Sequence, residues 1–246
     1  AISKFQDAER QKEFIDNAIA ARADGIIISP INSERVRKAI DRAVDSGIPV
    51  VATNADIDGT KRTCCVGINN RKAARIAGRL MGQFLGGTGK IAVVSSAIAS
   101  ENNNYYVQVR ETEFADFIHK EYPDIEIITT LDSFEDPQIT YEKTVKLLRD
   151  YQDLQGIYIT CGGVSQVGRA LEESGRAKDI RVISFEDYPE VVDLIRKDVI
   201  DCTLAGELQQ QGEIPVQIIM DYLVFGKEPE QQQIFTDIRV LVKESL

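Results

Sequence analysis

Polar side chains end several of the apolar, β-branched segments of this chain. Ser29, Asn54, Cys161 and Glu186 each follow such a segment directly. In sheets of parallel strands the carboxyl ends meet at one edge, and ligands bind there. Hydroxyl, amide and carboxylate groups exchange hydrogen bonds with the hydroxyls of a neutral ligand. We therefore expect these corners to hold a small polyhydroxylated molecule.

A second polar group opens the helix that we predict over 103–120. Its members are amides and a guanidinium, which make paired hydrogen bonds to adjacent hydroxyls: Asn102, Asn103, Asn104, Gln108 and Arg110. Tyr105 and Tyr106 are placed to stack on the apolar face of a sugar ring. A cleft lined in this way binds a sugar-like ligand without performing chemistry on it.

Each of these positions also has a structural interpretation. Asn54 suits a turn, and Glu186 or Asp187 suits the N-terminal cap of the next helix. Arg110 suits an intramolecular salt bridge, and the run 102–104 suits a solvated loop. The residue types alone leave both interpretations open.

The elements that must position these residues alternate between strand and helix. Predicted strands cover 2–5, 25–29, 48–53, 64–67, 90–95, 125–131, 156–161, 180–185, 199–205 and 234–242. Predicted helices cover 7–23, 33–45, 70–85, 103–120, 138–150, 165–174, 189–196 and 210–224. This pattern predicts an α/β protein with two similar lobes, each a parallel sheet flanked by helices. We expect an N-terminal lobe over 1–98, completed by a tail strand crossing near 234–246, and a C-terminal lobe over 99–233.

Composition and motifs exclude several classes of function. The net charge of −10 opposes binding to nucleic acid by this chain itself. No apolar run approaches the roughly 20 residues that span a bilayer, so we expect no membrane insertion. P-loop, dinucleotide-binding and nucleophile-elbow motifs are missing from the sequence, and His119 is its only histidine. We expect neither an enzyme nor a bound metal or cofactor.

The four cysteines have the spacing of neither a zinc site nor a redox pair. Unpaired thiols favour a reducing compartment, which points to the cytoplasm. The sequence starts at Ala1 without an initiator methionine, and we expect further polypeptide upstream.

Six segments, in this order and spacing, carry a resemblance to a known family. They are Asp7–Gln11, Ala23–Pro30, Gly47–Val51, Val66–Asn70, Val109–Phe114 and Ile183–Glu186. Over nearly its whole length the chain resembles type I periplasmic binding proteins and the effector-binding domains of LacI-type transcription regulators. The ribose-binding protein group is closest in pattern. The resemblance implies two lobes joined by three crossings, which close on a sugar or another small polar ligand.

The resemblance also assigns ligand contacts and shows departures from the family pattern. By position the contacts are Ser29, Asn54, Gln108, Cys161 and Glu186, with Arg110 nearby. Asn54-Ala55 stands where the family has Asp-Arg, Glu186 where it has Asp, and Gly206-Glu207 where it has Gln. These departures predict an unusual specificity. The family's first strand and helix have no counterpart here, so we also expect exposed apolar edges in the first lobe.

Two functions follow from the resemblance. The first is a regulator's effector-binding domain, cytoplasmic and homodimeric, which reaches DNA only through an upstream domain. The alternative is an extracytoplasmic sugar-binding protein of an ABC transporter, and an α/β enzyme is a remote third. In each binding role the expected contacts in the cleft between the lobes are Ser29, Asn54, Asn102, Asn104, Gln108, Arg110, Cys161, Glu186 and Glu207.

Overall fold

The structure is a computed structural model that describes residues 7–96, 105–134 and 136–246. The chain divides into two compact units. Of the described residues, unit 1 takes 7–69, 105 and 206–237, and unit 2 takes 70–96, 106–134, 136–205 and 238–246.

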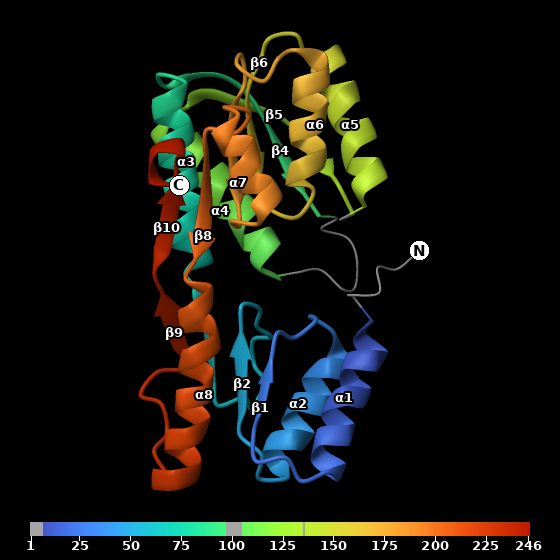
Figure 1. Cartoon of the computed structure of the whole chain (residues 1–246), viewed down its shortest axis with the longest axis vertical. Coiled ribbons are helices and arrows are strands. Elements are labelled where there is room, and N and C mark those ends of the chain that lie inside the picture. Colours follow the sequence, from blue (N-terminus) through green and yellow to red (C-terminus); the bar gives the residue numbers. More distant parts are fainter. Residues whose placement is uncertain (1–6, 97–104, 135) are drawn as a thin grey trace. The chain divides into compact units, whose positions relative to one another are not determined.

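Unit 1 contains a four-stranded parallel sheet with helices on both faces (Figure 1). Its elements are α1 (Ala8–Ala20), β1 (Ile26–Ile28), α2 (Glu34–Asp45), β2 (Val50–Thr53), β3 (Cys64–Ile68), α8 (Leu208–Phe225) and β9 (Gln233–Thr236). The strand order is β1-β2-β3-β9. Successive side chains of a strand point to opposite faces, so Val50 packs with α1 and α2 while Val51 packs against Ile219 of α8.

Unit 2 contains a six-stranded sheet in the order β10-β8-β7-β6-β4-β5. Its strands are β4 (Thr88–Ser95), β5 (Asp124–Asp132), β6 (Leu154–Ile159), β7 (Arg181–Phe185), β8 (Cys202–Gly206) and β10 (Ile238–Leu241). Its helices are α3 (Asn70–Phe84), α4 (Tyr105–Glu121), α5 (Pro137–Asp150), α6 (Val164–Ser174) and α7 (Pro189–Arg196), and a 3₁₀ turn covers Lys243–Ser245. Pairings among β4 to β8 are parallel.

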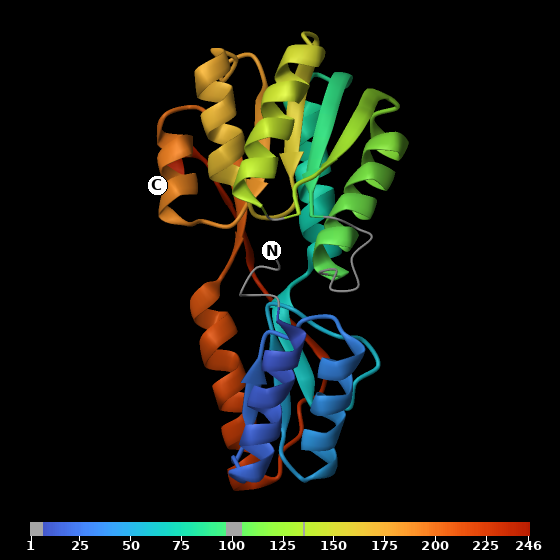
Figure 2. The same ribbon diagram turned by 90° about the vertical axis from the view of Figure 1, so that its right-hand side faces the viewer.

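Both faces of this sheet are covered. Leu147, Leu171 and Leu194 bring α5, α6 and α7 into one apolar cluster with β4, β6 and β7, and Figure 2 shows α5 and α6 side by side. On the opposite face Tyr158 of β6 stacks on Phe114 of α4, with ring centroids 4.0 Å apart. The predicted fold class, parallel sheets flanked by helices in two similar bodies, is confirmed.

The bodies of the units differ from the expected ranges 1–98 and 99–233. Helix α8 belongs to unit 1 because its Ile219 packs on Val51, Cys64 and Val66, whereas α3 and β4 belong to unit 2. The predicted tail strand is two strands, β9 in the sheet of unit 1 and β10 in the sheet of unit 2. The strand predicted over 2–5 lies outside the described residues.

Candidate functional site

The centre of the site in unit 2 is a buried arginine. Arg110 of α4 is 7% exposed. Its Nε donates a hydrogen bond to Oδ1 of Asn70 at 2.7 Å, and its Nη1 donates to the carbonyl of Thr160 at 3.1 Å. The guanidinium lies over the ring of Phe185, 3.9 Å from the centroid. Burial lowers the pKa of Arg110 and the charge of Glu186 acts against that effect.

Glu186 follows β7 directly and faces this arginine. Its backbone is left-handed, with φ of 72°, which is a costly conformation for a residue with a side chain. The amide of Glu186 donates to the carbonyl of Leu204 at 2.8 Å, and its carbonyl accepts from the Thr203 hydroxyl at 2.7 Å. These bonds to β8 hold the strained corner in place. The carboxylate Oε1 is 4.0 Å from Nη2 of Arg110, too far for a hydrogen bond.

Cys161 follows β6 and lies beside the same arginine. Its side chain is 8% exposed, and its Sγ is 3.4 Å from the Ser133 hydroxyl after β5. The preceding residue, Thr160, supplies the carbonyl that Arg110 binds. Unit 2 therefore brings Arg110, Cys161 and Glu186 together at the carboxyl edge of its sheet.

The other expected contacts in the helix are not part of this cluster as described. Gln108 is exposed on α4, and residues two apart on a helix point in different directions. Asn102 and Asn104 lie outside the described residues.

In unit 1 the expected contacts lie at the carboxyl ends of the strands. Ser29 is exposed after β1, and its carbonyl accepts from Nε2 of Gln11 at 2.9 Å. Asn54 is exposed after β2 with φ of 60°, and its backbone N–H donates a hydrogen bond to the Val66 carbonyl at 3.0 Å. The left-handed backbone suits a turn, and the exposed residue suits a ligand contact. Glu207 is half-buried at the N-cap position of α8.

The sequence reasoning missed Asn70, which orients Arg110. Asn70 is 5% exposed at the first position of α3. The signal was present: the tandem amides Asn69-Asn70 stand at the junction of a strand and a helix. Asp187, considered as a helix cap, instead forms an ion pair with Arg239 at 2.7 Å, and the N-cap of α7 is Tyr188.

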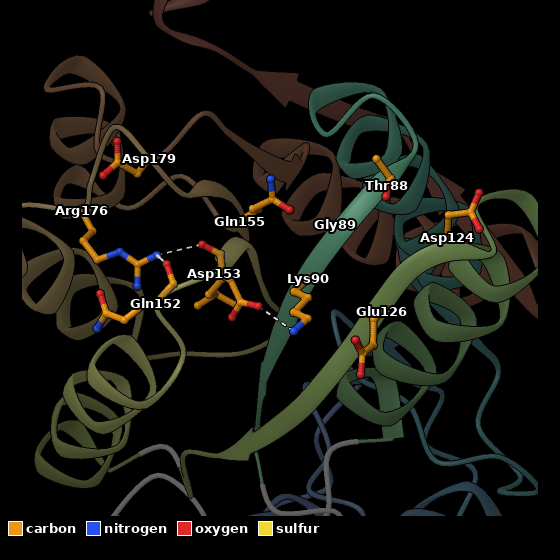
Figure 3. A pocket seen from close by; sticks show the side chains of 11 residues that line it. Thr88, Gly89, Lys90, Asp124, Glu126, Gln152, Asp153, Gln155, Arg176 and Asp179 are labelled. Carbon is orange, nitrogen blue, oxygen red and sulfur yellow. Dashed lines mark hydrogen bonds and ion pairs between the residues drawn. The ribbon is translucent and has the colours of Figure 1, made fainter.

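A hollow of about 780 Å³ lies at the opposite, amino edge of the same sheet (Figure 3). Its two cations already have protein partners: Lys90 pairs with Asp153 at 2.6 Å, and Arg176 donates to four backbone carbonyls. Ligands of parallel sheets bind at the carboxyl ends of strands, so we assign the site to the edge with Arg110.

Two further findings concern the described residues only. They contain no group of three or more His, Cys, Asp or Glu side chains that is suited to hold a metal ion. Among the helices of the described part, none combines the length and the apolarity needed to cross a membrane.

Comparison with known proteins gives consistent results. The sequence model of the periplasmic binding protein domain matches residues 3–228. A D-apiose import binding protein of Paraburkholderia graminis is 23% identical over 231 residues, covering 93% of this chain and 72% of that protein. A sugar-binding protein of a sugar ABC transporter from Bacillus halodurans is 28% identical, with a TM-score of 0.86 over 97% of this chain and 84% of that one. An arabinose-binding protein from Geobacillus stearothermophilus is 27% identical, with a TM-score of 0.83 over 97% of this chain and 83% of that one.

Proposed function

The chain belongs to the periplasmic binding protein domain family, and from that membership we propose that it is the sugar-binding component of an ABC importer. Its ligand is a monosaccharide, and it acts outside the cytoplasm. The quoted relatives support this reading because their descriptions name import or transport binding proteins. They favour the transport alternative over the regulator reading, so the upstream DNA-binding domain and the homodimer are not part of the proposal.

The cysteines are compatible with this location. Cys64, Cys65, Cys161 and Cys202 are all buried, and no disulfide joins them in the part of the chain that the structure describes. Burial raises the pKa of the Cys64 thiol to about 11 and that of Cys202 to about 12. Since the thiolate is the reactive form, protonated and enclosed thiols do not require a reducing compartment.

The observation that carries the proposal is the arrangement of Arg110, Phe185 and Glu186. Asn70 and the Thr160 carbonyl bind Nε and Nη1 of the arginine, which leaves Nη2 on the side of Glu186. Two adjacent sugar hydroxyls could bind this pair of charges: one accepts from the guanidinium and the other donates to the carboxylate. No reacting group is needed for this role, and the quoted relatives are binding proteins rather than enzymes.

Isothermal titration calorimetry of the purified chain tests the proposal. The probes are D-apiose, D-ribose, D-allose and L-arabinose, with D-ribose 5-phosphate and L-leucine as contrasts of other chemistry. We expect at least one of the four neutral sugars to bind with a Kd in the micromolar range or tighter. Binding of a contrast compound alone, or of none of the six, overturns the proposal.

A further inference from the structure

The neighbouring strand β8 holds the corner on which Glu186 stands. Thr203 of β8 is fully buried, and its hydroxyl donates a hydrogen bond to the carbonyl of Glu186 at 2.7 Å. The backbone N–H of Glu186 donates to the carbonyl of Leu204, the next residue of β8, at 2.8 Å. Both polar groups of the Glu186 backbone are thus bound to β8. Of these two bonds, the one from Thr203 depends on a side chain.

The type of residue at this corner makes the additional bond important. Glu186 is left-handed, with φ of 72°, and in unit 1 Asn54 also follows a strand with a left-handed backbone, with φ of 60°. The N–H of Asn54 likewise donates to the next strand, at the Val66 carbonyl. Asparagine enters the left-handed region readily, whereas a glutamate is strained there. The same kind of corner is therefore built on a less suitable residue at Glu186, and a second bond offsets the strain.

The residue after the corner has a weaker support of its own. Asp187 pairs with Arg239 of β10 at 2.7 Å, and β10 lies beside β8 in the sheet. Both side chains of this pair are partly exposed, at 23% and 39%, and ion pairs in contact with water contribute little. The pair also holds the side chain of Asp187 rather than the backbone of Glu186. The buried hydroxyl of Thr203 is therefore the main side-chain support of the corner.

The backbone of Glu186 decides where its carboxylate lies. Oε1 is 4.0 Å from Nη2 of Arg110, and a change of φ from the left-handed to the right-handed region would turn the side chain away from that position. Apparent affinity falls in proportion to the fraction of molecules in the conformation that binds. A group that fixes residue 186 therefore raises the affinity for a ligand of the carboxylate without touching the ligand.

We propose that Thr203 is a positioning residue of the site, which sets sugar affinity by holding Glu186 in the left-handed conformation. Its hydroxyl is enclosed and bound to the Glu186 carbonyl, so it acts through Glu186 and not by contact with the sugar. Thr203, Glu186 and Arg110 all belong to unit 2. This inference rests on the proposed function and explains what keeps one of its charged groups in place.

The test compares Thr203→Val, Thr203→Ser and Thr144→Val by calorimetry. Valine keeps the shape of threonine without the hydroxyl, whereas serine keeps the hydroxyl. Thr144 of α5 is the matched control, because it is equally buried and its hydroxyl also donates to a backbone carbonyl at 2.7 Å, that of Thr140. The probe is the sugar among D-apiose, D-ribose, D-allose and L-arabinose that the wild-type chain binds most tightly.

We expect Thr203→Val to weaken binding of that sugar by about three- to tenfold, the size of one hydrogen bond. Thr203→Ser and Thr144→Val should bind it nearly as tightly as wild type. In the absence of sugar, the backbone ¹³C chemical shifts of residue 186 should move away from left-handed values in Thr203→Val alone.

Wild-type affinity in Thr203→Val overturns the inference, and so does an equal loss of affinity in Thr203→Ser or Thr144→Val. Failure of the wild-type chain to bind any of the four sugars overturns the proposed function instead. The ¹³C shifts then decide on their own whether Thr203 fixes residue 186.

A second measurement needs no substitution. In NMR spectra of the wild-type chain, the hydroxyl proton of Thr203 should exchange slowly with water, because it is bound to the Glu186 carbonyl. A Thr203 hydroxyl proton that exchanges as fast as that of an exposed threonine contradicts the inference, whether or not Thr203→Val folds.

Discussion

The guanidinium of Arg110 lies across the face of Phe185, with its central carbon 3.9 Å from the ring centroid. A cation over an aromatic face gains about 2 kcal/mol or more where water is excluded. The same cation is oriented by Asn70 and by the Thr160 carbonyl. Arg110 of α4 thus connects the start of α3, through Asn70, with the end of β6, through Thr160. It therefore stabilises the fold and is also a candidate ligand contact.

Replacing this arginine should damage stability and binding together. Arg110→Met removes the charge and the hydrogen bonds that Arg110 donates to the buried Oδ1 of Asn70 and to the Thr160 carbonyl. Each lost bond to a buried group costs about 1–3 kcal/mol, so we expect the free energy of unfolding to fall by roughly 2–5 kcal/mol and sugar binding to disappear. Urea denaturation and calorimetry measure the two effects. The control is Arg75→Met, since Arg75 is an exposed arginine 5.9 Å from the Phe117 centroid; a similar loss of stability in both variants contradicts the account.

We expect the buried ion pair of Asp56 and Arg62 to stabilise unit 1 without affecting ligand binding. Asp56 and Arg62 bind each other with both side chains almost fully enclosed, and Nε2 of Gln233 on β9 donates to the same carboxylate at 2.6 Å. Arg62→Met leaves the carboxylate buried without its partner, which costs about 3–5 kcal/mol.

The exposed pair of Lys61 and Asp45, 2.7 Å apart, is the control for that prediction. Lys61→Met should change the free energy of unfolding by less than about 1 kcal/mol. Urea denaturation of the two variants decides the matter, and equal effects would show that burial of the Arg62 pair is not what stabilises it.

Two enclosed thiols predict a loss of stability in alkaline solution. Desolvation raises the pKa of Cys64 to about 11 and that of Cys202 to about 12 in the folded chain. Free thiols titrate near pH 8.5, so the unfolded chain loses these protons first. The stabilisation is fully present below that pH and is lost as pH rises towards 11–12.

We therefore expect the decline in stability between pH 8 and pH 11 to be shallower in Cys202→Ala than in the wild-type chain. Denaturation at several pH values measures this slope. Identical slopes would show that Cys202 does not contribute. Alkylation of the native chain by iodoacetamide at pH 8 should also leave Cys64 and Cys202 unmodified until denaturant is added.

Much of the fold follows from residue pattern because its determinants are local. Ser33 caps α2 as expected, accepting a hydrogen bond from the Val36 amide, and the apolar runs before Asn54 and Glu186 form β2 and β7. The C-terminal segment 234–242 was different, because its single apolar run predicts one strand. In the structure it forms β9, which pairs with β3, and β10, which lies beside β8 in the other sheet. Only tertiary packing shows this change.

The sequence predicts residues at the strand ends of the candidate site, but not the residues that hold them in place. Strand-end positions identify Cys161 and Glu186, because the ends of parallel strands share an edge. They do not identify Asn70, whose role depends on how α3 packs beside α4. Contacts of this kind join residues distant in sequence and carry no periodic signal.

The central claim is that a monosaccharide binds at the carboxyl edge of the unit 2 sheet, where Glu186 faces Arg110. Calorimetry of Glu186→Ala beside Glu190→Ala, a substitution of an exposed glutamate at the start of α7, tests it most directly. We predict that Glu186→Ala abolishes measurable binding of the sugar that wild type prefers, while the variant stays folded without sugar and Glu190→Ala binds normally. A wild-type Kd for that sugar in Glu186→Ala would contradict the claim.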